Sequence, residues 1–147
     1  MKAKKIYDIL DKISESYELE IKKVPIIFAN LPDNRAEYKE GKIFIDKKFV
    51  TQSSAEEIVF AILHEYFHHI LFEKMLIVSV HFDLDPEIVS IAAEFEINEI
   101  VNAIFKEKNI KISDSFLKTL YFAPHYGLPR LRTLKEYYDL IVKNQIF

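Results

Sequence analysis

Hydrophobic residues recur at steps of three and four along much of the chain, which is the spacing of a helix with one buried face. At the N-terminus this spacing predicts a helix that buries Ile6, Ile9, Leu10, Ile13 and Tyr17. Towards the C-terminus, capping residues predict a short helix over residues 113–122 and a last helix over residues 134–144, where the letters TLKE form a capping box.

Two longer helices are predicted in the middle of the chain. Ser53 or Ser54 can cap the first, over residues 55–73, and acidic residues follow in its first turn, where the helix dipole favours anions. The second begins at a proline and meets no helix breaker over residues 86–108.

Three short strands are predicted between the first helix and the middle pair. The letters VPIIFAN form one, and two more lie on either side of Glu40 and Gly41, where the glycine supplies the turn. Within the last strand, over residues 42–46, Ile43 and Ile45 alternate with Phe44, so one face is expected to be covered and the other partly covered. We expect an α+β fold with a small, three-stranded, mostly antiparallel sheet, and we expect the strand at 42–46 to offer an exposed edge to a peptide.

Composition and charge narrow the function classes. With 147 residues, half of them hydrophobic, the chain is predicted to form a single domain over residues 1–147 with a sizeable core. A net charge of −3 with interspersed signs argues against a nucleic-acid partner. No signal peptide and no run of about 20 apolar residues is present, so a cytoplasmic protein without a membrane partner is expected.

The helix over residues 55–73 carries the letters HEYFH, which fit the pattern HExxH. His64 and His68 are four residues apart, so both imidazoles project from one helix face and can reach one metal ion. Glu65 is rotated about 100° from His64, which suits contact with a metal-bound water rather than ligation. The chain has no cysteine, so nitrogen and oxygen must hold any metal. The alternative is that both histidines are ordinary buried side chains satisfied by backbone or water.

A catalytic zinc ion needs a third protein ligand and one open position. The helix over residues 86–108 is apolar apart from a narrow polar stripe formed by Glu87, Ser90, Glu94 and Asn98. Glu94 is the predicted third ligand of one zinc ion per chain. The alternatives lie in the predicted loop before this helix: His81, Asp83 and Asp85.

Other polar residues are candidates for supporting roles. Asn98 could orient a ligand histidine or form a plain hydrogen bond between helices. His125 and Tyr126 could stabilise an oxyanion, or they could fix their loop to the core. His69 is expected to pair with Glu73, four residues along the helix.

These two motifs resemble those of a known group of proteins. HExxH followed by a glutamate on the next helix resembles the gluzincin branch of zinc metallopeptidases. In that branch an aspartate commonly follows the ligand glutamate after four residues; this chain has Asn98 there, and Ala93 where an asparagine commonly precedes it.

A closer resemblance is to the metallopeptidase-like domain found beside von Willebrand A-type domains in predicted metal-dependent peptidases. The letters AAEFEIN and YGLPRLRTLKEYYDLI carry it, and it extends over about residues 55–141. It implies a small zincin-like domain, a zinc ion on His64, His68 and Glu94, and Glu65 as general base.

Three classes of function follow from these patterns. The favoured class is a zinc-dependent endopeptidase acting on a peptide or protein substrate. The second is a latent or non-catalytic regulatory protein with the same fold that binds a partner protein. Metal-dependent RNA cleavage is disfavoured by the acidic charge balance. The sequence leaves the oligomeric state open.

Overall fold

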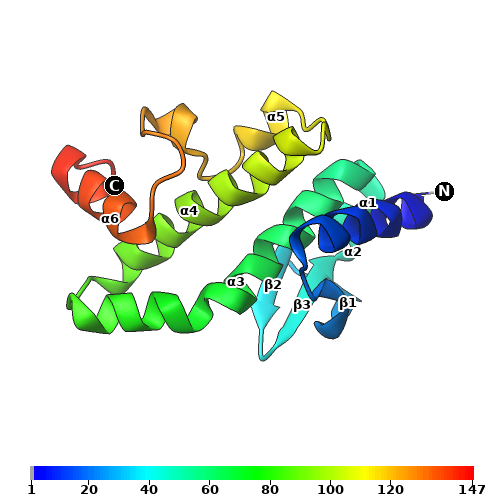
Figure 1. Ribbon diagram of the computed structural model, residues 1–147, viewed down its shortest axis with the longest axis horizontal. Helices are drawn as coiled ribbons and strands as arrows, with labels where there is room; N and C mark the ends of the chain where they lie inside the picture. The colour runs from blue at the N-terminus through cyan, green and yellow to red at the C-terminus, as the bar shows by residue number, and fades with distance from the viewer. Residues whose placement is uncertain (1) are drawn as a thin grey trace. The chain divides into compact units, whose positions relative to one another are not determined.

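The protein is described by a computed structural model over residues 2–147 (Figure 1). It is an α+β structure, as predicted, and its described part contains six α-helices, two short 3-10 helices and a three-stranded sheet. The elements, in chain order, are α1 (Lys2–Tyr17), η1 (Ile21–Lys23), β1 (Ile26–Ala29), β2 (Ala36–Lys39), β3 (Lys42–Asp46), α2 (Lys47–Gln52), α3 (Ala55–His81), α4 (Pro86–Glu107), α5 (Asp114–Leu117), η2 (Ala123–Tyr126) and α6 (Leu134–Asn144).

The sheet is mixed, with β3 in the centre. β2 and β3 form the predicted antiparallel hairpin, and its turn residues Glu40 and Gly41 have φ angles of 53° and 75°. β1 instead pairs with β3 in parallel, so the prediction of a mostly antiparallel sheet is wrong for this half. β1 and β2 follow one another in the chain but lie on opposite sides of the sheet, and β3, which comes after them, lies between them.

The central position of β3 also corrects the expected peptide-binding edge. Residues 42–46 pair with a strand on each side, so they offer no free edge. The alternation of burial along β3 was predicted correctly, because Ile43 and Ile45 are fully buried on either side of half-buried Phe44. The edges of this sheet are β1 and β2.

The described residues divide into two compact units. The first comprises residues 1–69 and 104–112, of which residue 1 lies outside the described part, and the second comprises residues 70–103 and 113–147. Both α3 and α4 continue from one unit into the other, and the expectation of a single domain stays a prediction.

In the first unit, polar contacts join the N-terminal helix and the strands to the helices that follow. Lys5 of α1 forms an ion pair with Glu56, in the first turn of α3. The carboxylate of Asp46, at the end of β3, caps α2 by accepting from the amide of Phe49, and it also accepts from the amide of Leu31 in the crossing connection.

The core of the second unit is built around α4 and α6. Its fully buried members include two alanines of α4, which let other segments approach that helix closely, and the rings of Phe95 and Tyr137, whose centroids are 5.6 Å apart. Burial raises the pKa of the Tyr137 hydroxyl to about 12. This hydroxyl donates to the carbonyl of Pro129 and accepts from the amide of Arg132, which fixes the loop before α6.

Two buried carboxylates of α4 hold the same loop. Glu99 is fully buried and accepts from Nε and Nη2 of Arg130 and from the amide of Leu131. Glu96 accepts a 2.6 Å hydrogen bond from the amide of Leu134 at the start of α6. These two side chains point away from the polar stripe expected on α4, and their hydrogen-bond partners explain why an apolar helix carries two buried carboxylates.

Helix boundaries follow the predicted caps but not every predicted end. Ser54 and Glu57 form a reciprocal capping pair at the start of α3. α3 continues to His81 rather than ending near residue 73, because the apolar segment after residue 74 contains no helix breaker. α5 ends at Leu117, well before the predicted residue 122. No helix in the described part is long and apolar enough to cross a membrane.

Most chain reversals after helices are made without glycine. A non-glycine residue takes a left-handed conformation just after α1, α3, α4 and α6, and these four residues are Glu18, Asp83, Asn109 and Gln145. Such a residue carries a steric cost that glycine avoids.

The buried carboxylate of Glu99 gives a test of how the second unit is held together. We expect Glu99→Ala to lower the free energy of unfolding by about 2–3 kcal/mol, because it leaves the Leu131 amide and the Arg130 guanidinium without their buried acceptor. Glu87→Ala, an exposed position in the first turn of α4, should cost less than about 1 kcal/mol. Urea unfolding followed by circular dichroism measures both, and equal losses would contradict this assignment.

Candidate metal centre

The HExxH segment lies in the buried first half of α3. The residues around it, from Ile58 to Phe67, are all buried, so tertiary packing fixes this half of the helix. His64 is 8% exposed and Glu65 is 9% exposed, which is an unusual degree of burial for two titratable side chains. His68 is half-buried.

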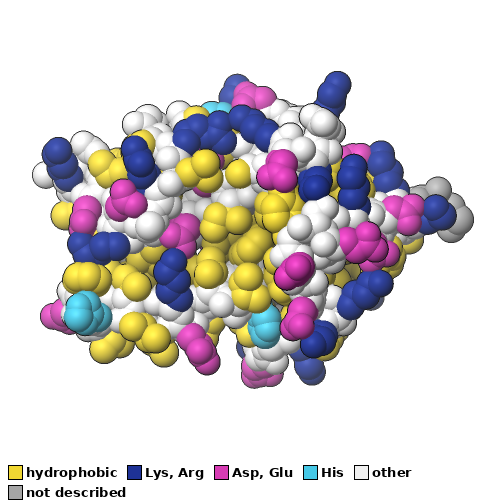
Figure 2. Space-filling view, viewed as in Figure 1, with side chains coloured by type: hydrophobic (Ala, Val, Ile, Leu, Met, Phe, Trp, Pro, Cys, Tyr) yellow, Lys and Arg dark blue, Asp and Glu magenta, His cyan; other side chains and the backbone are white. Residues whose placement is uncertain are grey.

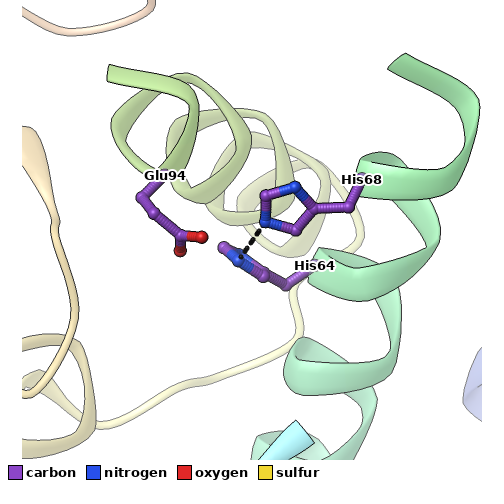
Figure 3. Close-up of side chains that lie close together, drawn as sticks. All are labelled: His64, His68 and Glu94. Carbon is purple, nitrogen blue, oxygen red and sulfur yellow. Dashed lines mark hydrogen bonds between the residues drawn. The ribbon is translucent and has the colours of Figure 1, made fainter. Parts of the chain in front are cut away.

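The two imidazoles converge as the four-residue spacing predicts. Nε2 of His64 and Nε2 of His68 are 3.1 Å apart, and the ring planes are inclined by 70° (Figure 3). Two nitrogens bound to one zinc ion at about 2.0–2.1 Å in a tetrahedral arrangement are about 3.3 Å apart. The observed separation therefore fits a shared ion, and it equally fits a hydrogen bond between two neutral imidazoles.

Glu65 reaches the same place from a different face of α3. Its Oε2 atom lies 3.8 Å from Nε2 of His64. This distance is too long for a hydrogen bond and leaves the carboxylate beside the point on which the imidazoles converge. A carboxylate in this position can accept a proton from a water molecule held there.

The predicted third ligand belongs to the same group. Among the described residues, one group of side chains could hold a metal ion: His64, His68 and Glu94 each place one ligand atom within 4.8 Å of the others. In Figure 3 the Glu94 carboxylate is directed towards the two rings. Two nitrogens and one oxygen form a ligand set suited to a catalytic zinc ion.

The three alternative ligands are not in this cluster. His81 is exposed at the end of α3, rather than in a loop, and its ring stacks on Phe82. Asp83 is exposed in the turn that follows. Asp85 accepts from the amide of Glu87 at the start of α4.

Asn98 contacts the backbone of the segment before η2. It is 1% exposed, and its Nδ2 donates to the carbonyl of Tyr121. This contact ties α4 to the chain that leads to His125 and Tyr126. A role for Asn98 in orienting a histidine stays a prediction.

The two oxyanion candidates lie in η2, in the second unit. His125 stacks on Phe122, and its Nε2 lies 3.1 Å from Oδ1 of Asp114. Hydrogen bonds from Lys118 and then from His125 lower the pKa of the Asp114 carboxyl. Tyr126 stacks on Phe95 in an edge arrangement. These contacts fix the segment to its unit, and an oxyanion role for either residue stays a prediction.

Tyr38 of β2 lies beside the candidate site, although no sequence pattern indicated it. Nδ1 of His69 lies 2.8 Å from the hydroxyl of Tyr38 on β2, so this pairing replaces the expected one with Glu73. The two residues are 31 positions apart, and no periodic pattern joins them. The contact places β2 next to the HExxH segment of α3.

Comparison with known proteins adds no family to this description. No protein-family model, no curated protein and no solved structure matches the chain.

The ligand assignment is tested by metal content. We expect dialysed wild-type protein to hold about one zinc ion per chain by mass spectrometry, and His64→Ala and Glu94→Ala each to lose most of it, because each removes a ligand. His125→Ala is the matched control, a histidine outside the cluster, and should keep its zinc. Full zinc retention in Glu94→Ala would contradict its place in the ligand set.

Proposed function

We propose that the protein is a zinc-dependent peptidase with a zincin-like arrangement of its two central helices. The observation that carries this proposal is the convergence of the His64 and His68 nitrogens to 3.1 Å, with the buried Glu65 carboxylate 3.8 Å from one of them. Glu94 completes the proposed ligand set of His64, His68 and Glu94. We also propose that the resemblance to the metallopeptidase-like domain, stated above from the sequence, reflects a shared function.

Each residue has a separate task in the proposed reaction. His64, His68 and Glu94 would hold the ion. When bound, zinc supplies Lewis acidity that makes water a stronger acid and polarises the scissile carbonyl. Glu65 takes a proton from the attacking water and returns it to the leaving amine. Its low exposure favours this role, because few solvent molecules compete for the carboxylate.

The free edge of β2 favours an extended peptide as the substrate. Lys39 and Lys42 are the closing pair of a two-residue hairpin loop, and the amide of Asp46 donates to the carbonyl of Arg35. Because hydrogen-bonded pairs alternate along an antiparallel ladder, the backbone groups of Ala36 and Tyr38 point to the edge that has no partner strand. A peptide added there would lie beside His69 and hence near the HExxH segment.

A non-catalytic regulator is the second candidate. The same metal ligands could serve a structural or sensing role, and the hydrogen bond that the 3.1 Å separation permits would pair the Nε2 atoms of His64 and His68 without an ion. Stoichiometric zinc together with no cleavage of a peptide library would favour this candidate.

The role of Glu65 is tested by a conservative variant. We expect Glu65→Gln to keep its zinc and to cleave a peptide library at least about 100-fold more slowly, because glutamine cannot accept the proton. Glu87→Gln, exposed on α4, should cleave at the wild-type rate. Full activity of Glu65→Gln would refute the general base. Loss of zinc in this variant would show that Glu65 is a ligand instead.

The substrate edge is tested by removing one backbone donor. Ala36→Pro deletes an N–H that points away from β3, so the sheet should stay intact. We expect it to lower kcat/KM for peptides about 3- to 10-fold, the equivalent of one hydrogen bond, with metal content unchanged. Ala36→Ser keeps the N–H and should behave as wild type. An unchanged kcat/KM in Ala36→Pro would rule out strand addition at β2.

A further inference from the structure

The face of β2 that is turned towards α3 has an uncharged, partly aromatic character. Side chains alternate between the two faces of a strand, so Ala36 and Tyr38 share one face of β2. Glu37 and Lys39 share the other. The contact between Tyr38 and His69 shows that the face of Ala36 and Tyr38 is the one turned to α3. The charged side chains of β2 therefore lie on the opposite face of the sheet.

Three rings stand together on this side of the first unit, and we call them the aromatic wall: Tyr38, His69 and Tyr66. The rings of Tyr38 and His69 are in edge contact, with centroids 5.1 Å apart, and the ring of Tyr66 lies 6.4 Å from that of His69. Polar contacts hold these rings in place. The Tyr38 hydroxyl lies 2.8 Å from Nδ1 of His69, and the Tyr66 hydroxyl accepts from the amide of Glu20.

Part of the aromatic wall is accessible to a bound molecule. Tyr66 is buried, whereas Tyr38 and His69 are only half-buried. In Figure 2, hydrophobic side chains, which include those of tyrosine, reach the surface over the part of α3 that passes β2. The accessible rings thus lie beside the edge of β2 that has no partner strand.

A peptide added to this edge would direct side chains at the aromatic wall. An added strand lies about 4.8 Å from its neighbour. Its residues opposite Ala36 and Tyr38 place their side chains on the same face of the sheet as these two residues, and therefore towards α3. Main-chain carbonyls stay close to the plane of the sheet, so the wall contacts the side chains of the peptide rather than its backbone.

The chemistry of this face favours an aromatic side chain. Aromatic pairs across neighbouring strands add to the stability of a sheet. Ala36 carries only a methyl group, so β2 itself offers little steric hindrance to a large side chain opposite that residue. A charged side chain would have no ion-pair partner on this face of β2, and burying it against rings is costly. We propose that the aromatic wall is a subsite that selects an aromatic side chain of the substrate. This inference rests on the proposed docking of a peptide at β2.

Binding of short alanine peptides, blocked at both ends, tests the subsite. The Glu65→Gln protein is used, since it should leave the peptides uncut. Peptides with one phenylalanine, placed at each position in turn, are compared with the all-alanine peptide by NMR titration of the β2 amides. We expect the best of them to bind about 3- to 10-fold more tightly, the equivalent of one aromatic pair. Equal affinities, or tighter binding of peptides with lysine in place of phenylalanine, would overturn the proposal.

Two variants of β2, each made in the Glu65→Gln protein, separate the ring from the strand. Tyr38→Ala should abolish the preference for phenylalanine, while the all-alanine peptide should keep its affinity because the main chain of β2 still binds it. Glu37→Ala is the matched control, since it removes the neighbouring side chain on the opposite face, and it should keep the preference. A preference that survives Tyr38→Ala would refute the assignment to the aromatic wall.

A further measurement does not depend on whether Tyr38→Ala folds. In the complex of the Glu65→Gln protein with the best phenylalanine peptide, nuclear Overhauser effects should join the phenyl protons to the ring protons of Tyr38, because paired rings have centroids about 4.5–7 Å apart. A bound peptide that shows no such effect to Tyr38 or His69 would overturn the proposal.

Cleavage by the wild-type protein separates failure of the subsite from failure of the proposed peptidase function. Selective binding of the phenylalanine peptides together with no cleavage would support the subsite and reject the peptidase. Cleavage of the alanine and phenylalanine peptides with equal kcat/KM would overturn the subsite alone.

Discussion

Burial of the first half of α3 is the constraint on which the candidate site depends. The four-residue step between His64 and His68 brings two Nε2 atoms to 3.1 Å only while the backbone stays helical. Helices of ordinary sequence are marginal alone in water, so the packing of residues 58–67 maintains this geometry. The same packing keeps Glu65 from free exchange with solvent. One structural condition therefore supports both the proposed metal ligation and the proposed proton transfer.

Buried carboxylates on the two central helices lie both at the candidate site and at structural positions. Glu65 of α3 is buried beside His64, whereas Glu96 and Glu99 of α4 are buried against backbone amides and Arg130. The donors around Glu96 and Glu99 satisfy these two carboxylates and give them a structural role. The neighbouring group, an imidazole for Glu65 and backbone amides or a guanidinium for Glu96 and Glu99, separates the candidate catalytic carboxylate from the two structural ones.

Much of this arrangement could be predicted from local sequence patterns. The HExxH spacing predicted the convergence of His64 and His68, and the polar stripe on the next helix singled out Glu94, because both arguments use only the helical repeat. Caps predicted the starts of α3 and α6 for the same local reason. Partnerships between distant residues could not be predicted in this way. The contact of His69 with Tyr38 and the parallel pairing of β1 with β3 depend on tertiary arrangement, which no short window of sequence encodes.

The glycine-poor helix ends have a consequence for how the chain tolerates change. Glu18 and Gln145 each hold a left-handed backbone at a cost of about 1–2 kcal/mol relative to glycine, whereas Asp83 and Asn109 adopt it more readily because their short polar side chains can hydrogen-bond locally. Glycine there would remove that strain but would widen the range of conformations open to the denatured chain, which offsets about 0.5–1 kcal/mol. At Glu18 and Gln145 the strain is the larger of the two effects by about 0.5–1 kcal/mol, so substitution by glycine there should stabilise the fold slightly.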